Sequence, residues 1–264
     1  PRPRPSRLAY KHTVFPLRSK LKYQWFCDKL VCVSQAARDT VVQGGLSPEH
    51  VAVIHGGFPD PHIDPNSKAR IREELQIADD QKLLVCVGNL LECKGHVDLV
   101  HALASLPSRE HARLVIAGRG EEDKALKRLV RELGLGSSVQ LLGYRDDANE
   151  LLAAADLVVH PSHAEGLSLV LIQAQMLAKP IVATPVGGAV EVLAADGPPR
   201  QGTWLARPQD PGSLADAISQ ALAQLAKPSP EFSEQLQDVS RETKMRFSIA
   251  QSAKKLADLA ASLQ

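Results

Sequence analysis

Two charged residues, Lys94 and Glu165, are the best candidates for chemistry in this chain. Each lies in a loop shortly after an apolar run, and each directly precedes a glycine. A lysine beside a helix N-terminus suits an anionic group such as a diphosphate, because the free amides and the dipole there favour negative charge. Gln173 lies eight positions after Glu165, which in a helix is roughly the same face. The spacing predicts a phosphate-bearing ligand whose hydroxyls also find polar partners.

These residues need a scaffold of strands and helices that alternate along the chain. A buried strand at 156–160 leads through a polar loop into a helix at 166–178, so Gly166, Leu167 and Ser168 are expected to offer N-terminal amides. Further strands are predicted at 82–88, 112–118, 139–142, 181–184 and 203–206, and helices at 95–105, 121–133, 147–155, 188–195 and 211–225. Continuous apolar strands between helices predict an α/β fold with a Rossmann-like parallel sheet covered on both faces.

Both ends of the chain differ from this pattern. The opening PRPRPSR is not expected to pack. It is followed by a predicted helix at 21–28, a strand at 29–34, a helix at 35–43 capped by Ser34, and a strand at 50–55. A proline-rich linker then follows. Two helices, 231–243 and 247–263, end the chain. The last is amphipathic, and either packs on the body or lies on a membrane surface.

Composition excludes several classes of protein. The 264 residues carry a net charge of +1 and only 4% aromatic residues, so a nucleic-acid partner is not expected. No apolar run approaches the roughly 20 residues of a membrane span. The four cysteines form no CxxC pair, and with no second pair of ligands we predict no metal. Without a visible signal peptide, the expected location is the cytoplasm.

The ordered motifs resemble glycosyltransferase family 4, the retaining family with the GT-B fold, and specifically its C-terminal nucleotide-sugar-binding half. The resemblance runs from about residue 29 to residue 226. Its motifs are VCVS at 31–34, VIHGG at 53–57, VGNLLECKGHVDLVHAL at 87–103, LVIAGRGEE at 114–122, VQLLGYRDD at 139–147 and the block from 155 to 188 that contains HPSHAEGLSLVLIQAQ.

The resemblance implies roles for individual residues. Lys94 would contact the donor diphosphate, and Glu165 would stabilise positive charge developing at the anomeric carbon. The remaining residues expected to bind the donor are Gly88, Asn89, Gly118, Arg119, Gly143, Tyr144, Gly166, Leu167, Ser168 and Gln173. Arg119 and Tyr144 also fit ordinary surface-loop residues, and Glu165 also fits an acid that only complements a helix dipole.

The chain departs from the family pattern at two positions and in its first domain. Asn89 stands where many members carry arginine, and Gln173 stands where the family has a second glutamate that accepts from both ribose hydroxyls. The first domain usually has a glycine-rich loop and an acceptor-side histidine, and neither is identified here. We therefore assign 1–60 to an incomplete acceptor domain and hinge, 61–228 to the donor domain, and 229–264 to helices packing back.

The resemblance implies transfer of a sugar, with retention, from a UDP- or GDP-sugar to a saccharide or lipid-linked acceptor, with no cofactor. Cell-envelope polysaccharide or lipopolysaccharide is the family's common product, and peripheral contact with the cytoplasmic membrane would go with it. Two alternatives stay open: a non-catalytic nucleotide-sugar-binding module, and the donor subunit of a two-chain enzyme whose partner brings the missing N-terminal domain.

Overall fold

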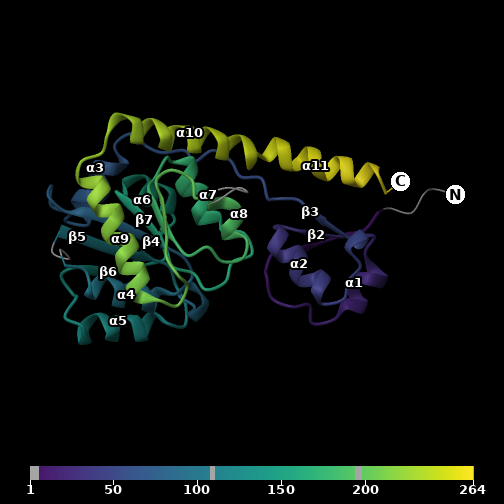
Figure 1. Cartoon of the computed structure of the whole chain (residues 1–264), viewed down its shortest axis with the longest axis horizontal. Helices are drawn as coiled ribbons and strands as arrows, with labels where there is room; N and C mark the ends of the chain where they lie inside the picture. The colour runs from purple at the N-terminus through teal and green to yellow at the C-terminus, as the bar shows by residue number, and fades with distance from the viewer. Residues whose placement is uncertain (1–5, 108–110, 194–197, 264) are drawn as a thin grey trace.

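The computed structural model describes residues 6–107, 111–193 and 198–263. Two parallel sheets with their helices form a small unit, residues 8–53, and a large unit, residues 67–226. A segment at 54–66 joins them, and the two C-terminal helices run along one side of both (Figure 1). No helix in the described part of the chain is long and apolar enough to cross a membrane.

The large unit contains a six-stranded parallel sheet whose order fixes where its loops meet. In spatial order the strands are β6 (Val139–Gly143), β5 (Ala112–Ala117), β4 (Lys82–Val87), β7 (Leu157–His160), β8 (Ile181–Ala183) and β9 (Thr203–Leu205). The chain fills the sheet outward from β4 to β6, then returns to place β7 on the other side of β4. The carboxyl ends of β4 and β7 therefore flank the point where the strand order reverses, which is where open α/β sheets bind ligands.

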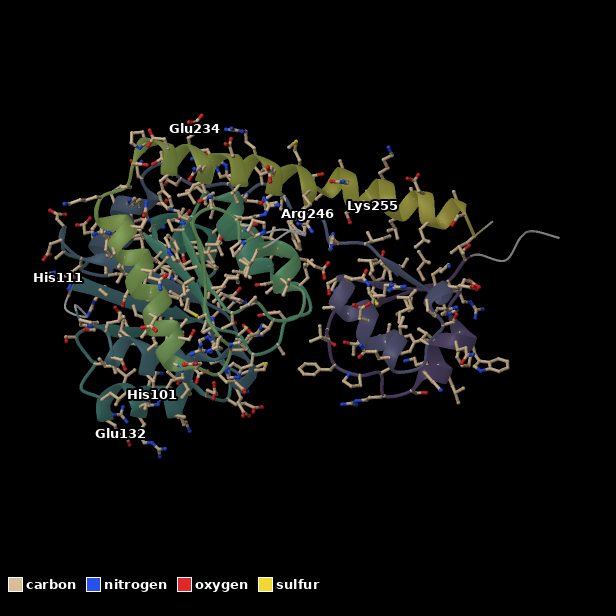
Figure 2. The ribbon with its side chains drawn as sticks, viewed as in Figure 1. His101, His111, Glu132, Glu234, Arg246 and Lys255 are labelled. Atoms are coloured by element: carbon tan, nitrogen blue, oxygen red, sulfur yellow. The ribbon has the colours of Figure 1, made fainter. Side chains whose placement is uncertain are left out.

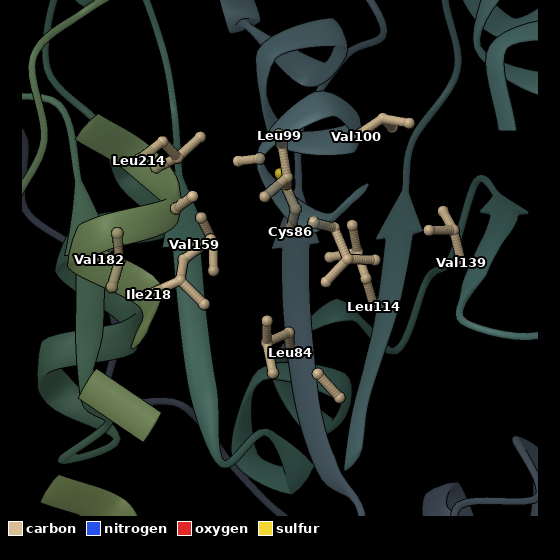
Figure 3. Packing of buried hydrophobic residues seen from close by; sticks show 14 of the residues in the cluster. Leu84, Cys86, Leu99, Val100, Leu114, Val139, Val159, Val182, Leu214 and Ile218 are labelled. Atoms are coloured by element: carbon tan, nitrogen blue, oxygen red, sulfur yellow. The ribbon is translucent and has the colours of Figure 1, made fainter. Parts of the chain in front are cut away.

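Helices cover both faces of this sheet, because its strands are apolar on both sides. The helices of the large unit are α3 (Ser67–Glu74), α4 (His96–Ala104), α5 (Asp123–Glu132), α6 (Ala148–Ala154), α7 (Leu169–Met176), α8 (Ala189–Leu193) and α9 (Pro211–Ala226), with a 3-10 turn η2 (Glu92–Lys94). Along β4, Leu84 and Cys86 point to the face under α4 and α9 (Figure 3). Leu83 and Val85 point to the face under α3, α6 and α7.

The small unit is a three-stranded parallel sheet in the order β1 (Leu8–Lys11), β2 (Lys29–Cys32) and β3 (Val51–Val53). Its other elements are α1 (Lys20–Phe26), α2 (Gln35–Gln43) and a 3-10 turn η1 (Pro48–His50). The Ser34 side chain caps α2 by accepting from the Ala37 amide at 3.1 Å, as the sequence predicts. Leu30 and Cys32 pack against Ala37 and Val41 to form the core of this unit.

The C-terminal helices α10 (Pro230–Arg246) and α11 (Ile249–Ala261) tie the units together. α10 packs on α7, where Ser240 Oγ donates to the Met176 carbonyl at 2.6 Å. α11 passes over the joining segment at 54–66, the hinge, and over the small unit (Figure 1). Ser252 Oγ on this helix donates to the His55 carbonyl at 3.0 Å. None of the α11 residues is fully buried, so this helix lies on the surface.

The structure differs from the sequence expectations at several element ends. The strand β1 and the helix α3 were not predicted, and Phe247 lies between the last two helices rather than inside one. The predicted helix at 166–178 begins only at Leu169, with Ser168 as its N-cap. The predicted helix at 188–195 ends at Leu193 within the described residues, since 194–197 lie outside them.

Candidate functional site

The loops that follow β4 and β7 meet at the reversal point of the sheet and bring Lys94 to Glu165. The contact depends on Gly95, which has a left-handed φ of +68° and lies directly against the Pro161 carbonyl. A Cβ at this position would collide with that carbonyl oxygen. The His163 amide donates to the Cys93 carbonyl at 2.8 Å, so the two loops are also joined by their backbones.

Glu165 accepts three hydrogen bonds through one carboxylate oxygen. Its Oε1 lies 2.6 Å from Lys94 Nζ, 2.8 Å from His160 Nε2 and 2.7 Å from Ser162 Oγ. The residue is only 6% exposed, so its side chain is buried. Buried charges persist when they are paired and hydrogen-bonded, and this carboxylate is both.

The pKa of Glu165 falls to about 2. Burial alone would raise it, but the hydrogen bond and charge of His160 and the charge of Lys94 outweigh burial. Glu165 is therefore an anion at any physiological pH. It is suited to stabilising positive charge and to accepting hydrogen bonds, and unsuited to acting as a general acid.

His160 connects this carboxylate to the start of α7. Its Nε2 lies 3.1 Å from Ser168 Oγ, and Ser168 accepts from the Leu171 amide at 3.4 Å as the helix cap. Gly166 and Leu167 precede the cap, so they are loop residues and not the N-terminal helix amides that we expected. Because Glu165 also lies outside the helix, the helical-face argument that paired it with Gln173 is wrong.

The glycine-containing loops after β4, β5 and β6 lie side by side at the same sheet edge. The Gly118 amide donates to the Gly143 carbonyl at 2.8 Å, and the Leu90 amide donates to the Arg119 carbonyl at 2.9 Å. The Arg119 guanidinium stacks over the Tyr144 ring at 5.3 Å. Tyr144 is 64% exposed, so this cation and ring form an open platform.

The remaining predicted residues occupy different environments. Gly88 continues β4 through its amide, which donates to the Ala117 carbonyl at 3.0 Å. Asn89 is exposed in the loop that follows β4. Gln173 lies in the middle of α7 with a half-buried side chain. The structure thus joins Lys94 directly to Glu165, while no described contact joins Asn89 or Gln173 to that pair.

The small unit closes over the Glu165 loop through backbone contacts. Gly166 lies directly under the His12 carbonyl, where a Cβ would collide with it. Gly188 lies against the Gly166 carbonyl, and its amide donates to the Glu165 carbonyl at 2.9 Å. The loop therefore contacts both the residue after β1 and the Gly187–Gly188 turn.

Sequence reasoning missed several of these residues. His160 and Ser162 were not predicted, although their position at the end of a buried strand was a signal that they face the same edge as Glu165. His12, whose carbonyl lies against Gly166, was not predicted either. It follows β1 directly, at the carboxyl end of a parallel strand, and that placement became visible only with the strand itself.

The comparisons with known proteins agree with this architecture. The family described as glycosyl transferases group 1 matches residues 67–244. Lipopolysaccharide glucosyltransferase WaaG of Escherichia coli is 30% identical over 221 residues, covering 82% of this chain and 57% of WaaG. D-inositol 3-phosphate glycosyltransferase 2 of Catenulispora acidiphila is 34% identical over 205 residues, covering 73% of this chain and 47% of that protein.

Solved structures show the same fold. HepE of Anabaena, crystallised in complex with UDP-glucose, superposes with a TM-score of 0.85 at 25% identity, covering 98% of this chain and 72% of HepE. This chain spans about half the length of the curated relatives that it matches. The family match covers well over half of the residues, from the helix α3 to the end of α10. The chain belongs to the family of glycosyl transferases group 1.

Proposed function

We propose that this chain carries the donor half of a retaining glycosyltransferase, which transfers a sugar from a nucleotide-diphosphate sugar to a saccharide or lipid-linked acceptor. The observation that carries the proposal is the ion pair between Lys94 and the buried Glu165 at the reversal point of the sheet. In this assignment residues 1–60 end the acceptor domain, 61–228 bind the donor, and 229–264 pack back on the body.

The two residues of the pair stabilise opposite charges that develop during the reaction. Lys94 binds the diphosphate and offsets the negative charge that grows on it as the bond to the sugar breaks. Glu165 faces the positive charge that develops at the anomeric carbon. In the free protein Lys94 is held by Glu165, so it is positioned before the donor arrives.

The nucleotide occupies the edge formed by the loops after β4, β5 and β6. Tyr144 and Arg119 lie beside the base, and the backbone of Gly88, Gly118 and Gly143 lines the approach. Gln173 accepts from one ribose hydroxyl through its amide oxygen, and Asn89 hydrogen-bonds without adding charge. Gly166, Leu167 and Ser168 shape the loop that contacts the donor sugar and phosphate.

His12 is the proposed acceptor-side residue. It follows β1, and its carbonyl lies on Gly166 beside Glu165, so the small unit brings it to the edge where the donor sugar would lie. A histidine there can accept the proton that the acceptor hydroxyl loses during transfer. This role depends on the closed arrangement of the two units.

The acceptor class is proposed from the family and its relatives. WaaG is named for lipopolysaccharide, so a cell-envelope glycan is the acceptor that we propose. The four cysteines are free thiols, which supports a reducing compartment such as the cytoplasm. Contact with the inner face of the cytoplasmic membrane would bring the enzyme to such an acceptor.

Calorimetric titration of the chain with UDP, GDP and ADP tests the donor assignment. Saturable binding of one nucleotide is expected, with UDP favoured because UDP-glucose binds the HepE fold. Replacing Gln173 with Glu is expected to tighten that binding, because a carboxylate accepts from both ribose hydroxyls. No binding of any of the three nucleotides overturns the proposal.

One specific observation favours a second candidate, a non-catalytic nucleotide-sugar-binding module. Gln173 stands where the family has an acid that accepts from both ribose hydroxyls, so this chain departs from the family's donor site at that position. Incubation with the radiolabelled sugar form of the bound nucleotide separates the two. Transfer to any acceptor, or hydrolysis lost in Glu165→Ala, favours the enzyme, and tight binding without either favours the module.

A further inference from the structure

His96 lies where the packing of α4 favours an apolar side chain. It is the first residue of the helix and shares a helical face with Leu99, Val100 and Leu103, which pack in the core of the large unit. The residue is only 1% exposed. A histidine buried to this extent is normally a core residue whose ring is hydrogen-bonded. The contacts of its two ring nitrogens therefore decide whether His96 is an ordinary core residue.

The imidazole of His96 lacks the hydrogen bonds that a buried polar ring needs. Its Nδ1 is buried and has no partner among the residues that the structure describes. Within the same part of the chain, Nε2 forms no hydrogen bond either. An unsatisfied buried polar group destabilises a protein, and a leucine would fill this place without that cost. The ring therefore remains free to form a hydrogen bond with a molecule from outside the chain.

The free ring points to the sheet edge at which the donor is proposed to bind. Nε2, at the tip of the ring, lies 3.8 Å from the place that a Cβ on Gly88 would take. Gly88 is only half-buried, so the end of β4 remains partly open to solvent there. Lys94 precedes His96 by two residues, and no side chain caps the start of α4. A lysine, uncapped helix amides and a free imidazole thus lie at the start of one helix, which favours an anionic ligand.

The surroundings of His96 keep its ring neutral. Its pKa falls to about 4, first because the ring is buried and then because His160, at the end of β7, and Lys94, in η2, disfavour a further positive charge. A neutral imidazole carries one N–H. The positive end of the α4 dipole favours a lone pair on Nδ1, the ring nitrogen nearer the backbone. We therefore assign the proton to Nε2, which faces Gly88.

We propose that His96 recognises phosphate, and that its Nε2–H donates a hydrogen bond to an oxygen of the donor diphosphate. This inference rests on the proposed function, because it takes the diphosphate bound by Lys94 as the ligand. Lys94 supplies charge on a flexible stem, whereas the neutral imidazole supplies a directed donor and adds no charge. Burial already fixes the ring, so little side-chain freedom is lost when the donor binds. The bound phosphate also gives the buried ring the partner that it otherwise lacks.

Titration of UDP and of uridine into the parent chain and its variants tests the proposal. His96→Leu is expected to lower UDP affinity about tenfold, as for a lost hydrogen bond to a charged acceptor, and to leave uridine affinity unchanged. His96→Gln places an amide N–H near the position of Nε2 and is expected to keep most of the UDP affinity. The shorter His96→Asn is expected to bind UDP as weakly as His96→Leu. His101→Leu, in the last turn of the same helix, is the control and is expected to bind as the parent does.

Thermal unfolding and the pH dependence of binding separate a ligand contact from a structural role. The melting temperature of His96→Leu without ligand is expected to equal or exceed that of the parent, because an apolar side chain replaces an unpaired buried ring. The ratio of UDP affinities between the parent and His96→Leu is expected to stay constant from about pH 6.5 to pH 8, because a neutral ring does not titrate there. Lys94, His160 and UDP itself are common to both titrations, so their own titration cancels in this ratio.

The contrary results can be told apart. Equal UDP affinity in the parent and in His96→Leu, or equal losses in His96→Gln and His96→Asn, overturns the role of Nε2. A weaker affinity together with a lower melting temperature in His96→Leu shows a structural residue, and an affinity ratio that rises as pH falls shows a charged ring; either overturns the proposal. If the parent chain binds no UDP, the proposed function fails and this inference fails with it. Binding of UDP by the parent that His96→Leu fully retains ends this inference alone.

Discussion

The charged and polar contacts of the site converge on one carboxylate oxygen of Glu165. Lys94, His160 and Ser162 all converge on Oε1, so the carboxylate is fixed in place before any ligand arrives. Such prior ordering lowers the cost of reaching the reactive arrangement. The charges at the site also balance one another within one buried network. Removing one member therefore leaves the charges of the others uncompensated.

The depressed pKa of Glu165 predicts how stability depends on pH. A carboxyl group with a folded pKa of about 2, below the ordinary 4.5, stabilises the protein above pH 4.5 and loses that contribution as pH falls toward 2. The shift corresponds to a contribution of about 3 kcal/mol at neutral pH, which falls to about half by pH 3.

Urea unfolding of the parent and of Glu165→Gln between pH 3 and pH 7 measures this contribution. The difference in unfolding free energy between the two proteins is expected to be constant above pH 5 and to shrink below it. Asp39→Asn, a substitution at an exposed acid, serves as the control. A difference that does not change between pH 5 and pH 3 would show that Glu165 has an ordinary pKa.

At the scale of the elements, the site depends on two loops that cross at Gly95. Its left-handed backbone and its contact with the Pro161 carbonyl let the loop after β4 approach the loop after β7. Without that approach, Lys94 would not reach Glu165. The glycine is therefore a structural condition for the ion pair.

Replacing Gly95 with Ala is expected to destabilise the protein by at least about 2 kcal/mol, because it adds left-handed strain and a collision with backbone. Nucleotide affinity is expected to fall as well, since Lys94 is displaced. Gly136→Ala is the matched control, because nothing lies within 4 Å of a Cβ there. Thermal unfolding and nucleotide titration check both effects. Equal stability and equal nucleotide affinity in the two variants would refute the role of Gly95.

The strands of the large unit could be predicted because their apolar runs are long and alternate with amphipathic helices. The strand β1 could not, since four residues with polar neighbours after a proline-rich start give little signal. The helix α3 is strongly polar, and only Ile71 and Ser67 of its residues are buried. The start of α7 was misplaced because Ser168, a strong N-cap, outweighs the glycine two residues earlier.

The site was predictable in part for the same reasons. Lys94 and Glu165 could be chosen from their loops and from the family resemblance, and the structure brings them together. Their partners could not, because the direction of a side chain such as His160 depends on strand register and on neighbours distant in sequence. The contact between the His12 carbonyl and Gly166 joins the two units, and no local sequence pattern indicates it.

At the scale of the whole molecule, Glu191 links the two units. Its Oε1 accepts from the Ala36 amide at the start of α2, at 3.2 Å, and its Oε2 lies 2.9 Å from His55 Nε2 in the hinge. The His55 ring also packs on Phe247 at 5.5 Å. Arg246 lies at the passage from α10 to α11 (Figure 2). Its guanidinium donates to the Glu191 carbonyl at 2.7 Å. Glu191 thus contacts the segment that joins the two units, the start of α2 and the end of α10.

Replacing Glu191 with Ala is expected to loosen the small unit from the large one, because the α2 amide and His55 lose their shared acceptor. The cost should be about 1–3 kcal/mol for a hydrogen-bonded, half-buried carboxylate. Hydrogen exchange is expected to speed up at the first turn of α2 while the six-stranded sheet stays protected. Unchanged exchange at Ala36 would show that the units are held together elsewhere.

The central claim is that Lys94, held beside Glu165, binds the diphosphate of the donor. The most direct measurement compares the affinities of UDP and uridine for the parent chain and for Lys94→Ala, with Lys124→Ala, which changes a lysine on α5, as the control. The account predicts that UDP affinity falls at least about tenfold in Lys94→Ala, as for a lost charge-assisted hydrogen bond, while uridine affinity stays the same. Equal UDP affinity in the parent and in Lys94→Ala would contradict it.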